Sequence, residues 1–301
     1  PEVGAAFSGL PFDHLLFTGA TSIARHIMTA AAKNLVPVTL ELGGKSPVLI
    51  SRSADIKTSI SRIMLGKTMN AGQICLAPDY MMVPEEKLDD VISEIKLTVA
   101  AMYPTMLKNP EYTSVINDRH FQRLQENLAD AAEKGGEVIS LAPAGEDFSK
   151  QEDTRKIAPT VVKNATDDMR ILQEEIFGPL LAIKTYKDFD ETIRYVNSQP
   201  RPLALYYFGS DASEERNVLD RTTSGGVCLN DVIMHIMQED LPFGGVGPAG
   251  MGSYHGHDGF KTFSHAKAIY KQAKIDVAGM AGMRPPYGPK THSTIKSQTK
   301  L

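Results

Sequence analysis

The sequence lacks several features that mark whole classes of protein. It has no tryptophan and only two cysteines among 301 residues, which excludes a disulfide framework and favours a reducing compartment. No apolar run approaches the roughly 18 residues that span a bilayer, and no signal-peptide pattern opens the chain. We therefore expect a cytoplasmic protein with no membrane partner.

The chain also lacks a large excess of either charge. Its 32 Lys and Arg residues stand against 36 Asp and Glu, for a formal net charge of −4. Such a balance does not attract nucleic acid, so we expect no nucleic-acid partner. A hydrophobic content of 42% with 23% charged residues is typical of a globular protein, and the length allows about two domains or one large one.

Short apolar runs alternate with helical patterns along most of the chain. Near its start, an apolar run at 15–17, a helical pattern at 22–34 and a second run at 36–42 predict a βαβ unit, with Thr21 or Ser22 capping the helix. Further strands are expected at 48–50, 80–83, 160–162, 204–208 and 226–230, and further helices at 56–65, 85–103, 120–134, 190–197 and 213–221. The alternation predicts an α/β fold built on a parallel sheet.

Two segments are weakly patterned. Residues 137–154 show no clear periodicity, and we expect them to be exposed. Residues 271–301 carry six Lys or Arg, one Asp and three prolines, with few apolar side chains. We interpret this end as a tail that is ordered only by a partner, if at all.

Cys75 is the first candidate for chemistry. It follows a turn of small residues at 70–74, after a predicted helix. A reactive thiolate needs a partly exposed, electropositive or amide-rich site, which such a turn can provide. A buried structural thiol is the alternative, and the turn alone does not decide between the two.

Glu41 is the second candidate, because it ends an apolar run just before Gly43 and Gly44. The carboxyl ends of parallel strands are where α/β folds place their sites, and a carboxylate there can activate water as a general base. A solvent-exposed acid is the alternative. Gly19 lies where a backbone can approach a pyrophosphate at a helix N-terminus, although the spacing to Ala24 makes only half of a dinucleotide-binding fingerprint.

Five short motifs occur in the order and spacing of a known family. They are Phe17-Thr18-Gly19, Glu41-Leu42-Gly43-Gly44-Lys45, Gly72-Gln73-Ile74-Cys75, Glu174-Glu175-Ile176-Phe177-Gly178-Pro179 and Pro242-Phe243-Gly244-Gly245. From 17 to 245 the chain resembles the aldehyde dehydrogenase superfamily. The stretch 241–256 is similar to the class 3 branch, which acts on fatty and aromatic aldehydes. Within that branch, 255–260 and 284–288 resemble bacterial coniferyl aldehyde dehydrogenases.

The resemblance implies a role for each motif. Cys75 would attack the aldehyde carbon, with its backbone N–H in the oxyanion hole, and hydride would pass to NAD or NADP. Glu41 would then activate the water that hydrolyses the thioester. Glu175 would bind the nicotinamide ribose, and Phe177 would pack beside the ring. The residues expected to border the cofactor are Gly19, Leu42 and Gly43. Cys228 is expected to pack in the core, and no metal is implied.

The resemblance also implies a domain organisation. Residues 1–43 would be the remnant of a Rossmann-type dinucleotide-binding domain, 44–247 the catalytic domain, and 248–301 a segment in subunit contact within a homodimer or homotetramer. Relatives carry roughly a further third of chain before this point, which includes the residues for the adenine ribose and the oxyanion-hole asparagine. Because strands removed from a sheet expose its core, we expect the chain alone not to fold as a stable monomer.

Two other functions remain open at this stage. One is an inactive chain that makes only assembly contacts and does not bind NAD+. The other is a CoA-dependent acylating relative, which passes the acyl group to a nucleophile other than water. The resemblance disfavours the second, because such relatives generally lack a general base at the position of Glu41.

Overall fold

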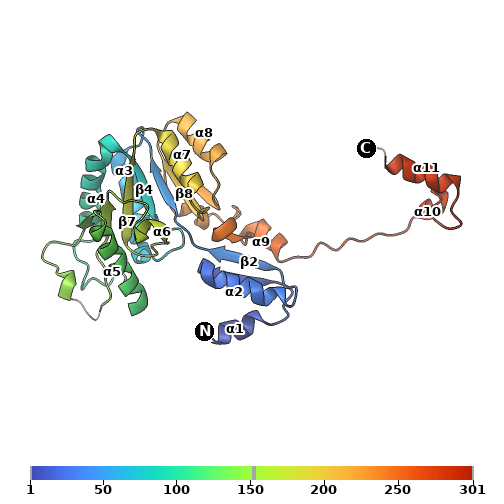
Figure 1. The fold of residues 1–301 in the computed structure, drawn as a ribbon, viewed down its shortest axis with the longest axis horizontal. Coiled ribbons are helices and arrows are strands. Elements are labelled where there is room, and N and C mark those ends of the chain that lie inside the picture. The colour runs from blue at the N-terminus through green and yellow to red at the C-terminus, as the bar shows by residue number, and fades with distance from the viewer. Residues whose placement is uncertain (1, 151–153, 300–301) are drawn as a thin grey trace. The chain divides into compact units, whose positions relative to one another are not determined.

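The chain divides into two compact units, and the boundary in the sequence lies between Phe263 and Ser264. A computed structural model describes residues 2–150 and 154–299. The first unit contains a seven-stranded sheet and a three-stranded sheet (Figure 1).

The seven-stranded sheet has the order β5-β6-β7-β4-β3-β8-β9. Its strands are β3 (Pro47–Ile50), β4 (Tyr80–Pro84), β5 (Glu137–Ser140), β6 (Thr160–Lys163), β7 (Leu180–Tyr186), β8 (Ala204–Phe208) and β9 (Gly226–Leu229). Neighbouring strands are parallel, except that β5 pairs antiparallel with β6 at one edge. The predicted α/β fold with a parallel sheet is confirmed.

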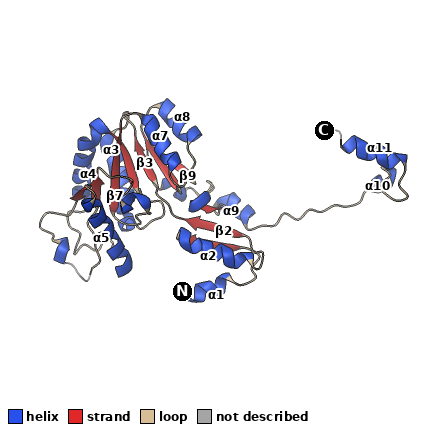
Figure 2. Ribbon diagram, viewed as in Figure 1, coloured by secondary structure: helices blue, strands red, loops and turns tan. Residues whose placement is uncertain are grey.

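Helices cover both faces of this sheet (Figure 2). They are α3 (Ile56–Thr68), α4 (Leu88–Met102), α5 (Asp118–Glu133), α6 (Arg170–Gln173), α7 (Phe189–Ser198) and α8 (Ala212–Arg221). Strand β3 shows how the core is shared: Val48 and Ile50 pack with α3 and α4, whereas Leu49 packs with residues of α5, α7 and α8. Burial on both faces explains why such strands are continuous apolar runs.

The three-stranded sheet is smaller and has the order β1-β2-β10. Its strands are β1 (Leu15–Gly19), β2 (Val38–Leu42) and β10 (Gly250–Met251), accompanied by α1 (Glu2–Ser8), α2 (Thr21–Ala32) and α9 (Gly256–Thr262). Strands β1 and β2 are parallel on either side of α2 in sequence, which confirms the predicted βαβ unit. The N-cap of α2 is Ala20, without a side-chain hydrogen bond, so the predicted cap at Thr21 or Ser22 is wrong.

The other differences from the sequence analysis concern weakly patterned chain. Strand β5 forms inside the stretch predicted to be irregular, because its backbone pairs with β6 while its side chains stay mostly exposed. Residues 151–153 of that stretch lie outside the described residues. Strand β7, between β6 and β4, had not been predicted. Short 3-10 helices are η1 (Met69–Gly72), η2 (Glu85–Lys87), η3 (Phe148–Lys150), η4 (Met234–Met237) and η5 (Gly247–Ala249).

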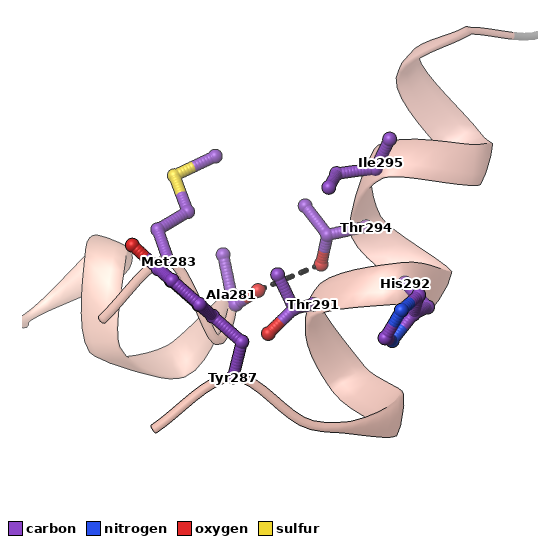
Figure 3. Close-up of a pocket in the computed structure, with 7 residues that line it drawn as sticks. All are labelled: Ala281, Met283, Tyr287, Thr291, His292, Thr294 and Ile295. Atoms are coloured by element: carbon purple, nitrogen blue, oxygen red, sulfur yellow. Dashed lines mark hydrogen bonds between the residues drawn. The ribbon is translucent and has the colours of Figure 1, made fainter. Parts of the chain in front are cut away.

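The second unit contains two short helices, α10 (Val277–Met280) and α11 (Pro289–Gln298), in the segment predicted to be a tail. Thr294 Oγ1 donates to the Ala281 carbonyl at 2.8 Å and joins the two helices (Figure 3). A pocket of about 430 Å³ lies between them, lined by Ala281, Met283, Tyr287, Thr291, His292, Thr294 and Ile295. The tail thus has helical order that its composition did not predict. Residues 300 and 301 lie outside the described residues.

Candidate active site

Three of the sequence motifs enter three adjacent parallel strands of the large sheet. Residues 41–46 lead into β3, residues 75–79 lead into β4, and residues 174–179 lead into β7, in the sheet order β7-β4-β3. Parallel neighbours place the segments that precede them at the same edge of a sheet. The candidate site therefore lies where the carboxyl end of β2 meets the amino ends of β3, β4 and β7.

The turn before Cys75 has a strained backbone. Asn70 and Ala71 have φ of 50° and 52°, a conformation that non-glycine residues rarely adopt, and Gly72 follows with φ of 70°. A Cβ on Gly72 would lie 2.3 Å from the carbonyl oxygen of Gly178. The segment that precedes β7 therefore packs directly on the turn that presents the thiol, and such strain is common at functional sites.

The Cys75 thiol is half-buried and lies within electrostatic range of two carboxyl groups. Burial raises its pKa to about 11, and the charges of Glu41 and Glu175 add to the rise. Backbone N–H groups of Cys75 and Leu76 oppose it, because they donate toward the sulfur. The thiol is therefore protonated at neutral pH, and nucleophilic attack requires a proton acceptor.

Glu41 lies at the end of β2 between Thr18 of β1 and Gly250 of β10. The residue is only 3% exposed, and its Oε1 has no hydrogen-bond partner among the described residues. Burial raises the pKa of the carboxyl group to about 7. A buried carboxyl group with a free oxygen and a pKa near neutrality has the properties of a general base.

Glu175 places its carboxyl group against Gly43. A Cβ on Gly43 would lie 2.2 Å from Glu175 Oε1, so only glycine permits this approach. Burial, and then the charge of Asp79, raises the pKa of Glu175 to about 7, while the Gly44 N–H opposes the rise. The structure thus brings Gly43 and Glu175 together, and the resemblance assigns both residues to the nicotinamide cofactor.

The remaining predicted residues lie nearby in the chain or the sheet. Gly19 is the register partner of Leu42 in the β1–β2 ladder, and Leu42 is buried. Phe177 follows Glu175 by two residues, has φ of 44°, and keeps 36% of its surface exposed. The structure places all seven predicted site residues on the three motif segments and the adjoining end of β1.

The first turn of α2 fits a dinucleotide cofactor. The helix has 12 residues, and within the described chain no side chain caps its N-terminus. Its first N–H groups and the positive end of its dipole are therefore available to an anion such as a pyrophosphate. Together with the unpartnered Oε1 of Glu41 and the glycine at position 43, this end of β1 and β2 can hold a nicotinamide dinucleotide.

An aromatic cluster beside the thiol had been given no role in the sequence analysis. The rings of Phe243 and His255 stack with centroids 5.0 Å apart, and Tyr254 meets His255 edge-on at 4.6 Å. Burial raises the pKa of Tyr254, and the charges of Glu41 and Cys75 add to the rise, so this ring lies within electrostatic range of both. The sequence analysis used the glycine-rich stretch that contains these residues only for its resemblance, and the aromatic residues within it were the signal that could have indicated the cluster.

Cys228 is buried in the core, as predicted. Its Sγ lies 3.0 Å from Nδ1 of His235, whose pKa burial lowers to about 4. Among residues 2–150 and 154–299, no group of three or more His, Cys, Asp or Glu is arranged to hold a metal ion. In the same described ranges, no helix is both long and apolar enough to cross a membrane.

Comparisons with known proteins identify the family of the chain. Residues 1–269 match the model of the aldehyde dehydrogenase family. A probable coniferyl aldehyde dehydrogenase of Caulobacter vibrioides is 58% identical over 300 residues, which cover 100% of this chain and 62% of that protein. The coniferyl aldehyde dehydrogenase of a Pseudomonas species is 58% identical over 98% of this chain and 61% of its own length.

Solved structures show the same fold. The substrate-bound AldH of Staphylococcus aureus superposes with a TM-score of 0.87 at 40% identity, over 99% of this chain and 63% of that one. An aldehyde dehydrogenase of Mycobacterium tuberculosis complexed with NAD+ gives a TM-score of 0.82 at 27% identity, over 92% of this chain and 57% of that one. The chain thus spans about three fifths of the proteins it matches. It belongs to the aldehyde dehydrogenase family.

Proposed function

We propose that the protein oxidises an aromatic aldehyde of the coniferyl type, or a fatty aldehyde, to the carboxylic acid with NAD or NADP. The observation that carries the proposal is the Cys75 thiol, within electrostatic range of two buried carboxyl groups with pKa values near 7. Of two relatives at 58% identity, one is named a coniferyl aldehyde dehydrogenase and the other a probable coniferyl aldehyde dehydrogenase, which supports the aromatic substrate. The rings of Phe243, Tyr254 and His255 supply an apolar wall for such a substrate.

Cys75 begins the reaction by attack of Sγ on the aldehyde carbon, after its proton passes to water or to a carboxylate of the site. The backbone N–H groups directed at the sulfur favour the thiolate, and the N–H of Cys75 stabilises the oxyanion that forms. A nicotinamide cofactor, when bound, supplies the hydride acceptor that turns the adduct into a thioester. Glu175 binds the ribose hydroxyls of that cofactor, and Phe177 packs beside its ring.

Glu41 acts when water cleaves the thioester. Its free Oε1 accepts a proton from the water as the oxygen bonds to the acyl carbon. The carbon–sulfur bond then breaks, the electron pair returns to Cys75 as a thiolate, and the acid leaves. Transfer of the acyl group to water distinguishes this reaction from transfer of the acyl group to CoA, which needs no such base.

The test uses the full-length protein with NAD+ and NADP+ in turn. Coniferyl aldehyde and a long-chain aliphatic aldehyde are supplied separately, and both the reduced cofactor and the acid are measured. We expect turnover with the aromatic aldehyde and none in Cys75→Ala, which should still bind NAD+. Binding of NAD+ without turnover on either aldehyde would contradict the proposal, and a CoA-dependent acyl product would support the acylating alternative.

We also propose the domain organisation given by the resemblance, with 1–43 in the cofactor domain, 44–247 in the catalytic domain and 248–301 in subunit contact. Strand β10 lies just after the proposed boundary at 247–248, yet it pairs with β2, which lies in the proposed cofactor domain. The start of the segment 248–301 is therefore joined to that domain. A homodimer or homotetramer is expected. Size-exclusion chromatography with light scattering, before and after removal of residues 264–301, tests whether the second unit carries subunit contact.

A further inference from the structure

Two basic side chains from different elements hold the backbone around Glu175. Lys45 Nζ, from the connection between β2 and β3, donates to the carbonyl oxygen of Glu174 at 2.9 Å. Arg123, on α5, donates to the carbonyl oxygens of Glu175 and Ile176 at 3.1 and 2.6 Å. Hydrogen bonds from charged groups are stronger than neutral ones, so this segment is fixed on several sides.

Asp79 connects these contacts. One of its carboxylate oxygens accepts from Lys45 Nζ, and the other accepts the Ile176 N–H at 2.8 Å. Its own N–H donates to the Ser46 carbonyl at 2.9 Å. Asp79 is 2% exposed, so both of its oxygens are used inside the protein. A single carboxylate thus ties together the segments that carry Glu41, Cys75 and Glu175.

We propose that Asp79, acting through Lys45 and the Ile176 N–H, is a positioning residue that holds Glu175 in place to bind the cofactor. The inference rests on the proposed function, in which Glu175 binds the nicotinamide ribose. Asp79 touches neither cofactor nor substrate in this scheme. It acts through Lys45 and the peptide groups that flank Glu175, and through the effect of its charge on the Glu175 carboxyl group.

The charge of Asp79 has a second consequence that can be measured, an effect on the pKa of Glu175. Asp79 raises the pKa of Glu175, whereas Lys45 and Arg123 lower it. Lys67, buried beside them, donates to the Pro78 carbonyl at 2.8 Å, and burial lowers its pKa to about 7. Removal of the Asp79 charge should therefore lower the pKa of Glu175 as well as loosen its backbone.

The test is a double-mutant cycle of Asp79→Asn with Glu175→Gln in the full-length protein, read as the Kd for NAD+ by calorimetry. Asparagine keeps the shape but loses the charge and one acceptor. We expect Asp79→Asn to weaken NAD+ binding about tenfold, the size of one lost charged hydrogen bond. In the Glu175→Gln background the same change should have less than about a twofold effect, because its target is already gone.

The inference would be overturned if Asp79→Asn weakened NAD+ binding equally with Glu175 and with Glu175→Gln, or weakened it in neither. Failure of the proposed function looks different: Glu175→Gln itself would then leave NAD+ binding unchanged. Asp167→Asn is the matched control, because the Asp167 carboxylate also accepts from a lysine, Lys184, and its other side-chain partner is the Tyr195 hydroxyl, outside the motif segments. It should leave the Kd unchanged.

A second variant keeps the inference testable if Asp79→Asn does not fold. Lys45→Met removes the partner through which Asp79 reaches the Glu174 carbonyl. It should weaken NAD+ binding when Glu175 is present and have little effect in Glu175→Gln, and Lys45→Arg should restore part of the loss. The pH profile supplies an independent readout: NAD+ affinity should rise with Glu175 ionisation, and Asp79→Asn should move that rise to lower pH. An unmoved profile would contradict the inference.

Discussion

The two sheets of the first unit differ in how completely they are covered. Strands β3 and β8 of the large sheet are buried at every position, with helices on both faces. Strand β1 of the small sheet instead alternates, with Leu15 buried and Leu16 43% exposed. The large sheet has two extensive apolar clusters, whereas the small sheet has two clusters of three buried residues each.

The difference shows how the candidate site is supported. Cys75 and Glu175 lie on segments that enter the fully covered sheet, and charged side chains form hydrogen bonds with the backbone around Glu175. Glu41 lies at the end of β2, whose neighbours β1 and β10 belong to the small sheet. Regions with few buried apolar contacts open at lower free energy. In this chain Cys75 and Glu175 are therefore supported by the covered sheet, whereas Glu41, the proposed base, lies on the sheet with less apolar cover.

The largest expected effect is at the nucleophile on the large-sheet side. Cys75→Ala in the full-length protein should lower kcat by more than about a thousandfold, because no other group can form the thioester. NAD+ affinity should change little, since cofactor contacts come from other residues. Steady-state kinetics and calorimetry measure the two quantities. Cys228→Ala is the matched control and should retain most activity; substantial turnover in Cys75→Ala would contradict the assignment.

The second prediction compares the cores of the two sheets. Leu49, at the centre of β3, is fully buried, and Leu49→Ala should lower the free energy of unfolding by about 2–5 kcal/mol. Leu16→Ala on the exposed face of β1 should cost less than about 1 kcal/mol. Urea unfolding followed by far-UV circular dichroism gives both values. Similar losses at the two positions would show that the small sheet is covered by something that the described residues do not include.

The third prediction concerns the base on the small-sheet side. Glu41→Gln should slow steady-state turnover by about a hundredfold, because thioester hydrolysis loses its proton acceptor. A pre-steady-state burst of reduced cofactor should survive, since hydride transfer precedes that step. Rapid-quench or stopped-flow kinetics measure the burst. Its loss together with turnover would instead assign Glu41 to removal of the Cys75 proton.

The pH dependence of the wild-type protein follows from the same carboxyl group. Only ionised Glu41 can accept a proton, and its pKa is about 7, so kcat should rise as pH increases through 7. Stability should change in the opposite direction. Because the folded pKa lies above the ordinary value of 4.5, the ionised form is disfavoured in the fold, and stability falls as pH rises from 4.5 through 7. Glu41→Gln should remove this contribution, at most about 3 kcal/mol.

The contrast between the sheets also explains what the sequence could predict. Strands such as β3, covered on both faces, appear as short apolar runs, and the motif residues could be placed on segments that the structure brings together. Strand β5 could not be found, because backbone pairing with β6 holds it rather than side-chain burial. Asp79 and Arg123 were missed for a related reason: they bond backbone groups distant in sequence, and no local pattern reports such contacts.

The smallest expected effect is a difference in reactivity between the two cysteines, which both belong to the large-sheet core. Burial raises the pKa of both thiols, so the fraction of thiolate alone does not distinguish the two cysteines. A difference in reactivity must come from a difference in access to the sulfur. Cys75 is half-buried in the turn before β4, whereas Cys228 is 8% exposed in β9 with His235 Nδ1 3.0 Å from its sulfur.

Limiting iodoacetamide followed by peptide mapping should therefore label Cys75 about tenfold faster than Cys228. Raising the pH toward 9 should speed both reactions, because each thiol ionises above neutrality, but the preference should persist. Labelling in denaturant is the control, since unfolding removes the difference in access and should bring the two rates together. Preferential labelling of Cys228 in the folded protein would show that the turn at 70–74 does not open the thiol to small reagents, and an aldehyde carbonyl needs the same opening.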